Sequence, residues 1–282
     1  MIILAKRIES PSSINTFKQC PRKYFYQYIQ ELPVLSNIHQ VRGSIAHSTL
    51  EKFYDLDVTQ FKEEDYANQF QSAIQKLFLY HWKRAQPEFK KLDLNLDQEK
   101  FYFEETMLML MNWLGQFIIE FNKTKAEKKL SIPEIFMLLT PIREQQLISD
   151  NYSVQGFIDA IHCLEDEIHI IDYKTNSSLE FKEEIKLQLA IYSLLYFEKY
   201  GVKPSKVGIF FLRHKLKMMN VDDALLELAK REIELIHAHT SKTDKIEDYP
   251  QKTGPLCRWS TGRCDFFEPC GPFGNGNGCK KK

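Results

Sequence analysis

The sequence predicts an α/β fold in which a mixed sheet is flanked by helices. Three observations support this prediction. Residues 152–175 alternate apolar and polar positions with a period of two, as the two strands of a hairpin do. Residues 207–212 form a further apolar run of strand length, and they follow a segment with helical periodicity at residues 182–200. Long segments rich in Phe, Tyr, Leu and Met at helical spacing precede the hairpin.

Composition limits the class of protein. The 282 residues are enough for one large domain or two small ones, and 43% of them are hydrophobic, which suffices for a sizeable core. Lysine plus arginine balance aspartate plus glutamate at 38 each, so any attraction to nucleic acid must come from local patches. No segment is apolar enough to span a bilayer, and residues 1–5 are too short an apolar run for a secretory signal. We therefore expect a cytoplasmic protein with no membrane partner.

The elements before the hairpin are expected in the following order. A helix begins at residues 10–12 and runs toward Gln30, residues 32–41 form a connector, and a second helix covers residues 43–54. Residues 63–85 and 98–121 form two long helices whose aromatic side chains pack mainly in a core. They lie in a predicted helical insertion, residues 56–130, of a single domain covering residues 1–282. Residues 135–148 supply strand material that is interrupted at Pro141.

The hairpin and the later elements complete the expected fold. Its strands cover residues 152–164 and 168–175, and Glu165 to Glu167 form the polar turn. The helix at residues 182–200 ends at Gly201, and a buried strand follows at residues 207–212. Residues 222–241 form a further helix, and the Gly/Asn-rich residues 271–278 are expected to be flexible.

Three charged residues lie inside this apolar hairpin, Asp159 on the first strand and Asp172 and Lys174 on the second. Asp172 and Lys174 share one face because they are two positions apart. A two-residue loop, Glu165-Asp166, would place Asp159 opposite Asp172, whereas a three-residue loop would place it opposite Tyr173. The sequence leaves this register open. Charge is normally excluded from apolar strands unless something binds it, and a divalent metal is the simplest such partner.

Two carboxylates and a lysine suit the hydrolysis of phosphodiester bonds. Asp159, Asp172 and the main-chain carbonyl of Tyr173 would hold Mg²⁺ or Mn²⁺ through oxygen atoms. Lys174 would orient the attacking water or stabilise the transition state. The alternative for an isolated Asp-x-Lys is a solvated charge pair on an edge strand. The other motifs of the chain decide between these interpretations.

These residues belong to an ordered series of motifs: Cys20-Pro21-Arg22-Lys23-Tyr24, Gly43 to Glu51, Gly156-Phe157-Ile158-Asp159, Asp172-Tyr173-Lys174, Gln188 to Tyr192, and late cysteines. In their order and spacing the sequence resembles the RecB-like branch of the PD-(D/E)XK nuclease superfamily, which includes the nuclease domains of RecB and AddB and the CRISPR-associated exonucleases. The resemblance implies a restriction-endonuclease-like core and a metal-dependent DNA nuclease. It favours exonuclease action on DNA that is single-stranded or has free ends. Ile158 stands where the superfamily name would put proline, which is common in this branch.

The resemblance also assigns a role to His47. From the residues alone, His47 would be an ordinary core histidine satisfied by a backbone carbonyl. The resemblance implies instead that it is a metal ligand, and an imidazole ligand favours Mn²⁺ more than an all-oxygen site does. Glu51 lies one turn further along the same helix face and is expected to orient His47 or a basic neighbour.

Four further residues are candidates for contact with nucleic acid. Gln188 and Tyr192 are four positions apart and therefore project from one helix face. The resemblance implies that they contact nucleic acid or brace the lysine, although an ordinary amphipathic helix is the alternative. Arg22 and Arg213 lie in basic groups and are candidate phosphate contacts.

Four of the six cysteines lie near the end of the chain, namely Cys257, Cys264, Cys270 and Cys279. Such density without a secretory signal favours metal over disulfides. The resemblance implies that Cys20, Cys257, Cys264 and Cys270 ligate a [4Fe-4S] cluster, with residues 250–282 packing back on the N-terminal helix. The spacing departs from that of relatives, because six residues separate Cys257 from Cys264. A Zn²⁺ site of Cys257, Cys264, Cys270 and Cys279 therefore stays open. Cys163 is expected to be a buried apolar filler.

A binding or assembly module that keeps this scaffold without turnover is the competing hypothesis. The acidic and lysine positions argue against it, because a purely structural role gives no reason to bury them. The sequence does not choose among DNA repair, recombination, spacer acquisition and viral DNA processing, and it identifies no protein partner.

Overall fold

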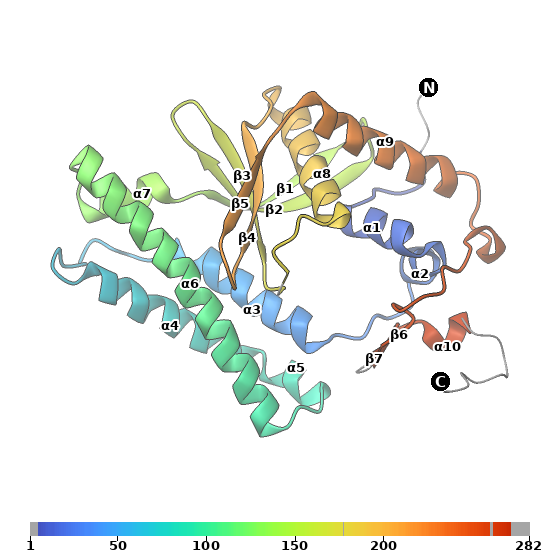
Figure 1. Ribbon diagram of the computed structural model, residues 1–282, viewed down its shortest axis with the longest axis horizontal. Coiled ribbons are helices and arrows are strands. Elements are labelled where there is room, and N and C mark those ends of the chain that lie inside the picture. The colour runs from blue at the N-terminus through green and yellow to red at the C-terminus, as the bar shows by residue number, and fades with distance from the viewer. Residues whose placement is uncertain (1–4, 177, 260–261, 272–282) are drawn as a thin grey trace.

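The computed structural model describes residues 5–176, 178–259 and 262–271, and its centre is a five-stranded mixed sheet (Figure 1). The strands lie side by side in chain order: β1 (Ile142–Ser149), β2 (Val154–Cys163), β3 (Ile168–Lys174), β4 (Lys206–Phe211) and β5 (Leu216–Asn220). Neighbouring strands are antiparallel except β3 and β4, which are parallel and are connected by helix α8 (Glu183–Tyr200). Helices cover both faces of the sheet, so the predicted α/β class is confirmed.

One face of the sheet packs against α8, α9 (Asp223–Thr240) and α1 (Pro11–Gln19), which lie together at the upper right of Figure 1. Ile158, Ile170 and Ile209 of the strands are fully buried in the same core cluster as Leu194 of α8 and Ile233 of α9. Helix α8 ends at Gly201, whose φ of 71° is the left-handed conformation that glycine adopts readily. The predicted helices at residues 182–200 and 222–241 are therefore both present.

The other face packs against a separate layer of helices, which lies along the left and lower side of Figure 1. This layer contains α3 (Ile38–Phe53), α4 (Tyr66–Arg84), α5 (Gln86–Lys91), α6 (Leu96–Lys128) and α7 (Ile132–Leu139). Its core is aromatic, and Phe53, Phe70 and Trp113 are buried in one cluster with Ile171 and Tyr173 of β3. Most of the aromatic residues expected to form a core in this region do so, whereas Tyr80 and Phe101 are 53% and 56% exposed. Neighbouring residues of β3 thus face opposite layers, as the period-two alternation predicted.

The single helix predicted from residue 10 to Gln30 is broken in the structure. Ser10 and Ser13 form a capping box that starts α1, and the chain becomes extended at Cys20, where φ is −158°. The break follows from Pro21, because the residue before a proline is disfavoured in helical conformation. A short helix α2 (Pro21–Tyr24) and a π-helical turn (Phe25–Ile29) continue the chain. Cys20 consequently sits at a corner between helices.

Residues 135–139 are helical, so the strand predicted to begin at residue 135 was wrong in its first half. Ser131 and Glu134 form a capping box that starts α7, and Ile132, Ile135 and Phe136 are its buried side chains. A short buried apolar run has no visible periodicity, which explains why sequence reasoning took it for a strand. Helix α3 likewise begins earlier than expected, at Ile38, after a capping box of Asn37 and Gln40.

Strand β5 was not predicted, and several short elements complete the chain. They are a 3₁₀ turn (Ile246–Asp248), the two-stranded hairpin β6 (Arg258–Trp259) and β7 (Gly262–Arg263), and α10 (Phe267–Cys270). The segment predicted to be flexible, residues 271–278, lies outside the described residues apart from Gly271. Within the described part of the chain, no helix has the length and apolar character needed to cross a membrane.

The hairpin of β2 and β3 has the two-residue loop that sequence analysis left open. Leu164 N–H donates to Glu167 O at 2.9 Å, and Ala160 pairs with Ile171. Continuing this register by one residue places Asp159 opposite Asp172. The alternation of β2 is interrupted at the same point, because Ile158 and Ile161 both lie in the cluster beneath α8. Two acidic side chains therefore come together where the strand pattern is irregular.

Candidate metal centre

The end of β3 brings together side chains from two layers of the fold. Asp159 Oδ2 accepts a hydrogen bond from Tyr173 N–H at 2.7 Å, and Asp159 Oδ1 lies 3.3 Å from His47 Nδ1. His47 reaches this point from α3, and its Nε2 lies 3.0 Å from the carbonyl oxygen of Tyr173. Three of the predicted metal-binding groups, namely His47, Asp159 and the Tyr173 carbonyl, are thus in direct contact.

Asp172 and Lys174 form the other half of the site. Asp172 is only 2% exposed, and Lys174 Nζ lies 2.8 Å from its Oδ2. Gln188 Nε2 donates to Asp172 Oδ1 at 2.8 Å and to the Tyr192 hydroxyl, also at 2.8 Å. Gln188 and Tyr192 therefore share a face of α8, as their spacing predicted. In this structure they hold the buried carboxylate in place.

A glycine allows α8 to approach the strand that carries Asp159. A Cβ atom on Gly156 would lie 2.9 Å from Tyr192 Cε1, closer than such atoms approach, and would make a tight contact of 3.1 Å with Leu195 Cδ1. Any larger residue at this position would push Tyr192 or the strand away. The glycine of the Gly-Phe-Ile-Asp motif thus has a packing role, three residues before Asp159.

Glu144 is a third carboxylate at this centre, and sequence analysis assigned it no role. Ligand atoms of His47, Glu144 and Asp159 all lie within 4.8 Å of one another. Glu144 belongs to β1 and has a φ of 45°, an unusual conformation for a residue with a side chain. The register of β1 on β2 places it opposite Asp159, since Arg143 pairs with Ala160 and Gln145 with Ile158. The short turn between β1 and β2 was the one sequence signal that could have revealed this pairing.

Electrostatics at the centre depend on burial and on charge pairing. Burial alone would lower the pKa of His47, but its hydrogen bond to Asp159 and the charge of Asp159 outweigh burial and raise the pKa to about 9. Burial raises the pKa of Asp172 to about 6, and the charge of Lys174 opposes that shift. Burial and the charge of Asp159 raise the pKa of Glu144. A cation that binds His47 at neutral pH must therefore displace a proton from its ring.

The donor set fits a divalent cation. Carboxylate and carbonyl oxygens are the ligands that Mg²⁺ and Mn²⁺ take, and one imidazole is compatible with Mn²⁺. The group of His47, Glu144 and Asp159 could hold such an ion, with the buried Asp172 and the ammonium of Lys174 beside it.

Arg22 and Arg213 contact backbone carbonyls in this structure, and Glu51 pairs with a basic neighbour, which is one of the two roles expected for it. Arg22 Nε donates to Tyr249 O at 2.8 Å, and Arg213 Nε donates to Thr175 O at 3.1 Å. Both arginines therefore stabilise the fold through backbone carbonyls. The side chain of Glu51 pairs with its neighbour Lys52 at 3.2 Å.

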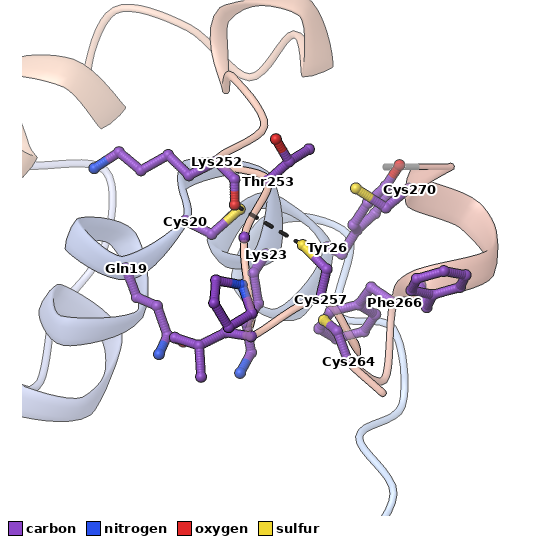
Figure 2. Close-up of a pocket in the computed structure, with 14 residues that line it drawn as sticks. Gln19, Cys20, Lys23, Tyr26, Lys252, Thr253, Cys257, Cys264, Phe266 and Cys270 are labelled. Carbon is purple, nitrogen blue, oxygen red and sulfur yellow. Dashed lines mark hydrogen bonds between the residues drawn. The ribbon is translucent and has the colours of Figure 1, made fainter. Parts of the chain in front are cut away.

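A second cluster of chemically reactive residues lies where the two ends of the chain meet. Cys20, Cys257, Cys264 and Cys270 line one cavity of about 240 Å³, together with aromatic residues such as Tyr26 and Phe266 (Figure 2). Hydrogen bonds to backbone carbonyls fix the cavity walls. Arg22 N–H donates to Pro250 O at 3.2 Å, and the Tyr26 hydroxyl donates to Pro269 O at 2.8 Å. Burial raises the pKa of the Cys264 and Cys270 thiols.

The four thiols do not form a group with the spacing of a single-ion site. Among the described residues, the group whose ligand atoms come within 4.8 Å of one another is that of His47, and it contains no cysteine. A tetrahedral Zn²⁺ with sulfur ligands at about 2.3 Å would need sulfurs about 3.8 Å apart. Cys279 lies outside the described residues. Cys163 is exposed at the end of β2 rather than buried, because the strand leaves the core at the hairpin turn.

A protein family and two known proteins match most of this chain. A model of the PD-(D/E)XK nuclease superfamily matches residues 9–271. The chain is 24% identical over 234 residues to a subunit of the ATP-dependent helicase/deoxyribonuclease of Carboxydothermus hydrogenoformans, a match that covers 77% of this chain. The match covers only 21% of that relative, so the chain spans about a fifth of its length. A solved structure from Eubacterium rectale, provisionally assigned as an exonuclease, matches with a TM-score of 0.49 and 11% identity over 98% of this chain and 91% of that one.

Proposed function

The chain belongs to the PD-(D/E)XK nuclease superfamily, and from this membership we propose that it is a divalent-metal-dependent deoxyribonuclease. The observation that carries the proposal is the meeting of His47, Asp159, Asp172 and Lys174 at the end of β3. These groups come from a helix and two strands, and the two aspartates are buried while His47 and Lys174 are partly exposed beside them. The carboxylates would be costly to bury together unless a cation neutralised them.

In this proposal the protein holds a cation and keeps an ammonium beside it. His47, Asp159, Asp172 and the Tyr173 carbonyl would be the ligands predicted by sequence, and Glu144 joins them by position. The bound ion would activate a water molecule and neutralise charge on the phosphate. Burial acts to lower the pKa of Lys174, but the charge and hydrogen bond of Asp172, together with the charge of Asp159, outweigh burial and raise it. Lys174 therefore stays protonated at neutral pH and acts as a cation that orients water or stabilises charge, not as a base.

Gln188 and Tyr192 serve this site indirectly. One amide group of Gln188 donates both to Asp172 and to Tyr192, so the carboxylate is held in one orientation. Residues that orient a metal-binding carboxylate are typical of metal sites. We therefore propose that this pair positions Asp172, the partner of Lys174, whereas the sequence suggested contact with nucleic acid or with the lysine itself.

The substrate we propose is DNA with a free end or in single-stranded form, cleaved exonucleolytically. The relative from Carboxydothermus hydrogenoformans carries deoxyribonuclease in its name, which supports DNA as the substrate. End-labelled linear DNA, single-stranded and duplex, should release labelled nucleotides in Mn²⁺ or Mg²⁺ and none in a chelator. Covalently closed circles incubated in parallel should persist. Cleavage of circles at the rate of linear DNA would contradict the exonuclease assignment, and binding without turnover in any divalent metal would favour the non-catalytic module.

For the cysteine cavity we propose a [4Fe-4S] cluster held by Cys20, Cys257, Cys264 and Cys270. Each thiolate of such a cluster binds a different iron, so the four sulfurs need not meet the spacing of a single ion. The unusual six-residue interval is bridged by the β6–β7 hairpin, which folds the chain back so that Cys264 N–H donates to Cys257 O at 3.0 Å. The hairpin brings the two cysteines together despite their separation in sequence. The thiols of the described cysteines are free, and we accordingly retain the reducing cytoplasm as the proposed location.

Anaerobic purification tests the cluster directly. The protein should absorb near roughly 400 nm and contain stoichiometric iron and sulfide. Cys264→Ser should lose this absorbance and lower the melting temperature, because the cluster connects the two ends of the chain. Cys163→Ser is the matched control, since Cys163 is exposed and distant in the fold from the cavity. A colourless protein with bound zinc would exclude the cluster and favour the Zn²⁺ alternative.

A further inference from the structure

One carboxylate of helix α6, that of Glu105, is linked through Arg213 to the residue that follows Lys174. Glu105 of α6 forms ion pairs with Arg42 of α3 and with Arg213 of the β4–β5 turn, each arginine meeting a different carboxylate oxygen. Arg213 in turn donates from Nε to Thr175 O at 3.1 Å. We call Arg42, Glu105 and Arg213 the clamp. It connects the helix that carries His47 with the strand that carries Asp172 and Lys174.

The end of β3 is held from three sides over three consecutive residues. His47 Nε2 contacts Tyr173 O, Leu212 N–H donates to Lys174 O at 2.9 Å, and Arg213 binds Thr175 O. One turn before His47, Gly43 lies against Thr175, since a Cβ there would be 3.7 Å from Thr175 Oγ1. Helix α3 therefore runs along the end of β3, and its position decides how far His47 is from Asp159.

Asn112, two turns along α6 from Glu105, adds a second attachment to the same turn. Its Nδ2 donates to Leu212 O at 3.0 Å and to His214 O at 2.8 Å. Together, Glu105 and Asn112 fix the β4–β5 turn, from which Leu212 and Arg213 reach the end of β3. The long helix α6 is thus attached to the metal centre although none of its side chains enters it.

The clamp is partly buried, and its Arg42 guanidinium is almost fully removed from solvent, whereas the Arg213 side chain is 23% exposed. The side chain of Arg42 is 3% exposed and that of Glu105 is 19% exposed. Arg42 Nε has no hydrogen-bond partner among the described residues, so Glu105 is the main source of compensation for this guanidinium, with the Tyr102 ring 5.3 Å away. Burial acts to raise the pKa of Glu105, but its hydrogen bonds to Arg213 and Arg42 outweigh this and keep it ionised. Replacing the carboxylate by an amide would therefore change the position of both arginines.

We propose that Glu105 is a positioning residue for the metal centre, acting through Arg42 and Arg213 to set the spacing between His47 and the carboxylates of β2 and β3. The proposal rests on the proposed function, because it takes this centre to be a cation site. It adds a residue from the predicted helical insertion, a region in which the sequence offered no functional motif. Substituting a residue that holds a metal ligand in place typically lowers metal affinity or activity by about 10- to 100-fold.

The test is Mn²⁺ affinity measured by isothermal titration on the full chain, together with kcat and KM on an end-labelled oligonucleotide. For Glu105→Gln we expect an Mn²⁺ affinity about tenfold lower and a kcat about tenfold lower, with KM within about twofold of wild type. The matched control is Glu104→Gln, which makes the same change at the preceding residue of α6, where the side chain is 61% exposed and pairs with Lys100. This control should behave as wild type.

A second substitution keeps the proposal testable if Glu105→Gln does not fold. Arg213→Lys keeps a positive charge but cannot donate from Nε to Thr175 O. It should lower Mn²⁺ affinity and kcat in the same direction, and combining it with Glu105→Gln should add little, because the two residues act in series. Additive effects would contradict the proposal. Folded variants with wild-type Mn²⁺ affinity and a raised KM would overturn it and assign Arg213 to DNA binding.

The wild-type protein separates this proposal from the proposed function. If wild type binds Mn²⁺ and cleaves DNA while Glu105→Gln is unchanged, only the positioning role of Glu105 fails. If wild type neither binds Mn²⁺ nor cleaves DNA, the proposed function fails and the positioning role fails with it.

Discussion

Replacing Lys174 by alanine should abolish DNA cleavage while leaving the protein folded. Lys174 is the ammonium nearest the buried Asp172, at 2.8 Å, and its side chain is 30% exposed, so its removal opens no large cavity. Loss of one group that stabilises transition-state charge costs about 10²- to 10³-fold in turnover. Asp172→Asn should have an effect at least as large. It removes a negative charge from the proposed metal site and replaces one acceptor oxygen by an NH₂ group, which donates hydrogen bonds.

The measurement is release of end label from linear DNA, with circular dichroism and DNA binding recorded on the same preparations. DNA binding should stay near wild type in both variants, because the contacts of the Asp172 and Lys174 side chains are to other side chains and the protein main chain keeps its position. Lys203→Ala is the matched control, since Lys203 pairs with Asp223 on the surface at 2.8 Å, away from the centre. Retained cleavage by a pure, folded Lys174→Ala or Asp172→Asn protein would remove this centre from consideration as the active site.

Replacing Glu144 by glutamine should lower Mn²⁺ affinity and cleavage together, each by about 100-fold, as expected when a metal centre loses a charged ligand or its close partner. The physical reason is its position, since its ligand atom lies within 4.8 Å of those of His47 and Asp159. Affinity is measured by isothermal titration and cleavage by the end-label assay. Glu144→Asp, which keeps the charge on a shorter chain, should retain part of both.

The control for this experiment is Glu165→Gln. Glu165 is an exposed glutamate of the β2–β3 turn that pairs with Lys128 at 2.7 Å, so it tests the general effect of losing one negative charge on the hairpin. Equal losses in the two variants would mean that Glu144 acts only through net charge. Unchanged affinity in Glu144→Gln would exclude it as a ligand.

The contrast between Asp172 and Glu144 shows what could be predicted from the sequence. Period-two alternation places Asp172 and Lys174 on one strand face, but the sequence left open whether Asp159 lies opposite Asp172 or Tyr173, and the two-residue loop of the structure decides for Asp172. The spacing of Gln188 and Tyr192 fixes a shared helix face in the same way. These are local relations, and the structure has all of them.

Glu144 and the clamp could not be predicted in this way because their positions depend on packing between distant elements. Glu144 itself has a left-handed φ, and it lies opposite the point at which the alternation of β2 is interrupted. No periodic pattern in the sequence signals such a break. The basic neighbours of Arg213 predicted a phosphate contact, but they gave no sign of its partners within the fold, because a long flexible side chain takes whatever partner the fold supplies. Here the partners are Glu105 and the carbonyl of Thr175.

The meeting of Cys20 with Cys257, Cys264 and Cys270 at one cavity has a thermodynamic consequence for the whole chain. A cofactor bound to these cysteines would close a loop of about 240 residues, and restricting the unfolded chain by such a closure would be worth roughly 5 kcal/mol in the chain-entropy relation. That is comparable to the net stability of an entire domain. Such a cofactor would act as a removable cross-link, and its loss would shift the balance between the folded and unfolded populations without any change at the carboxylates of β2 and β3.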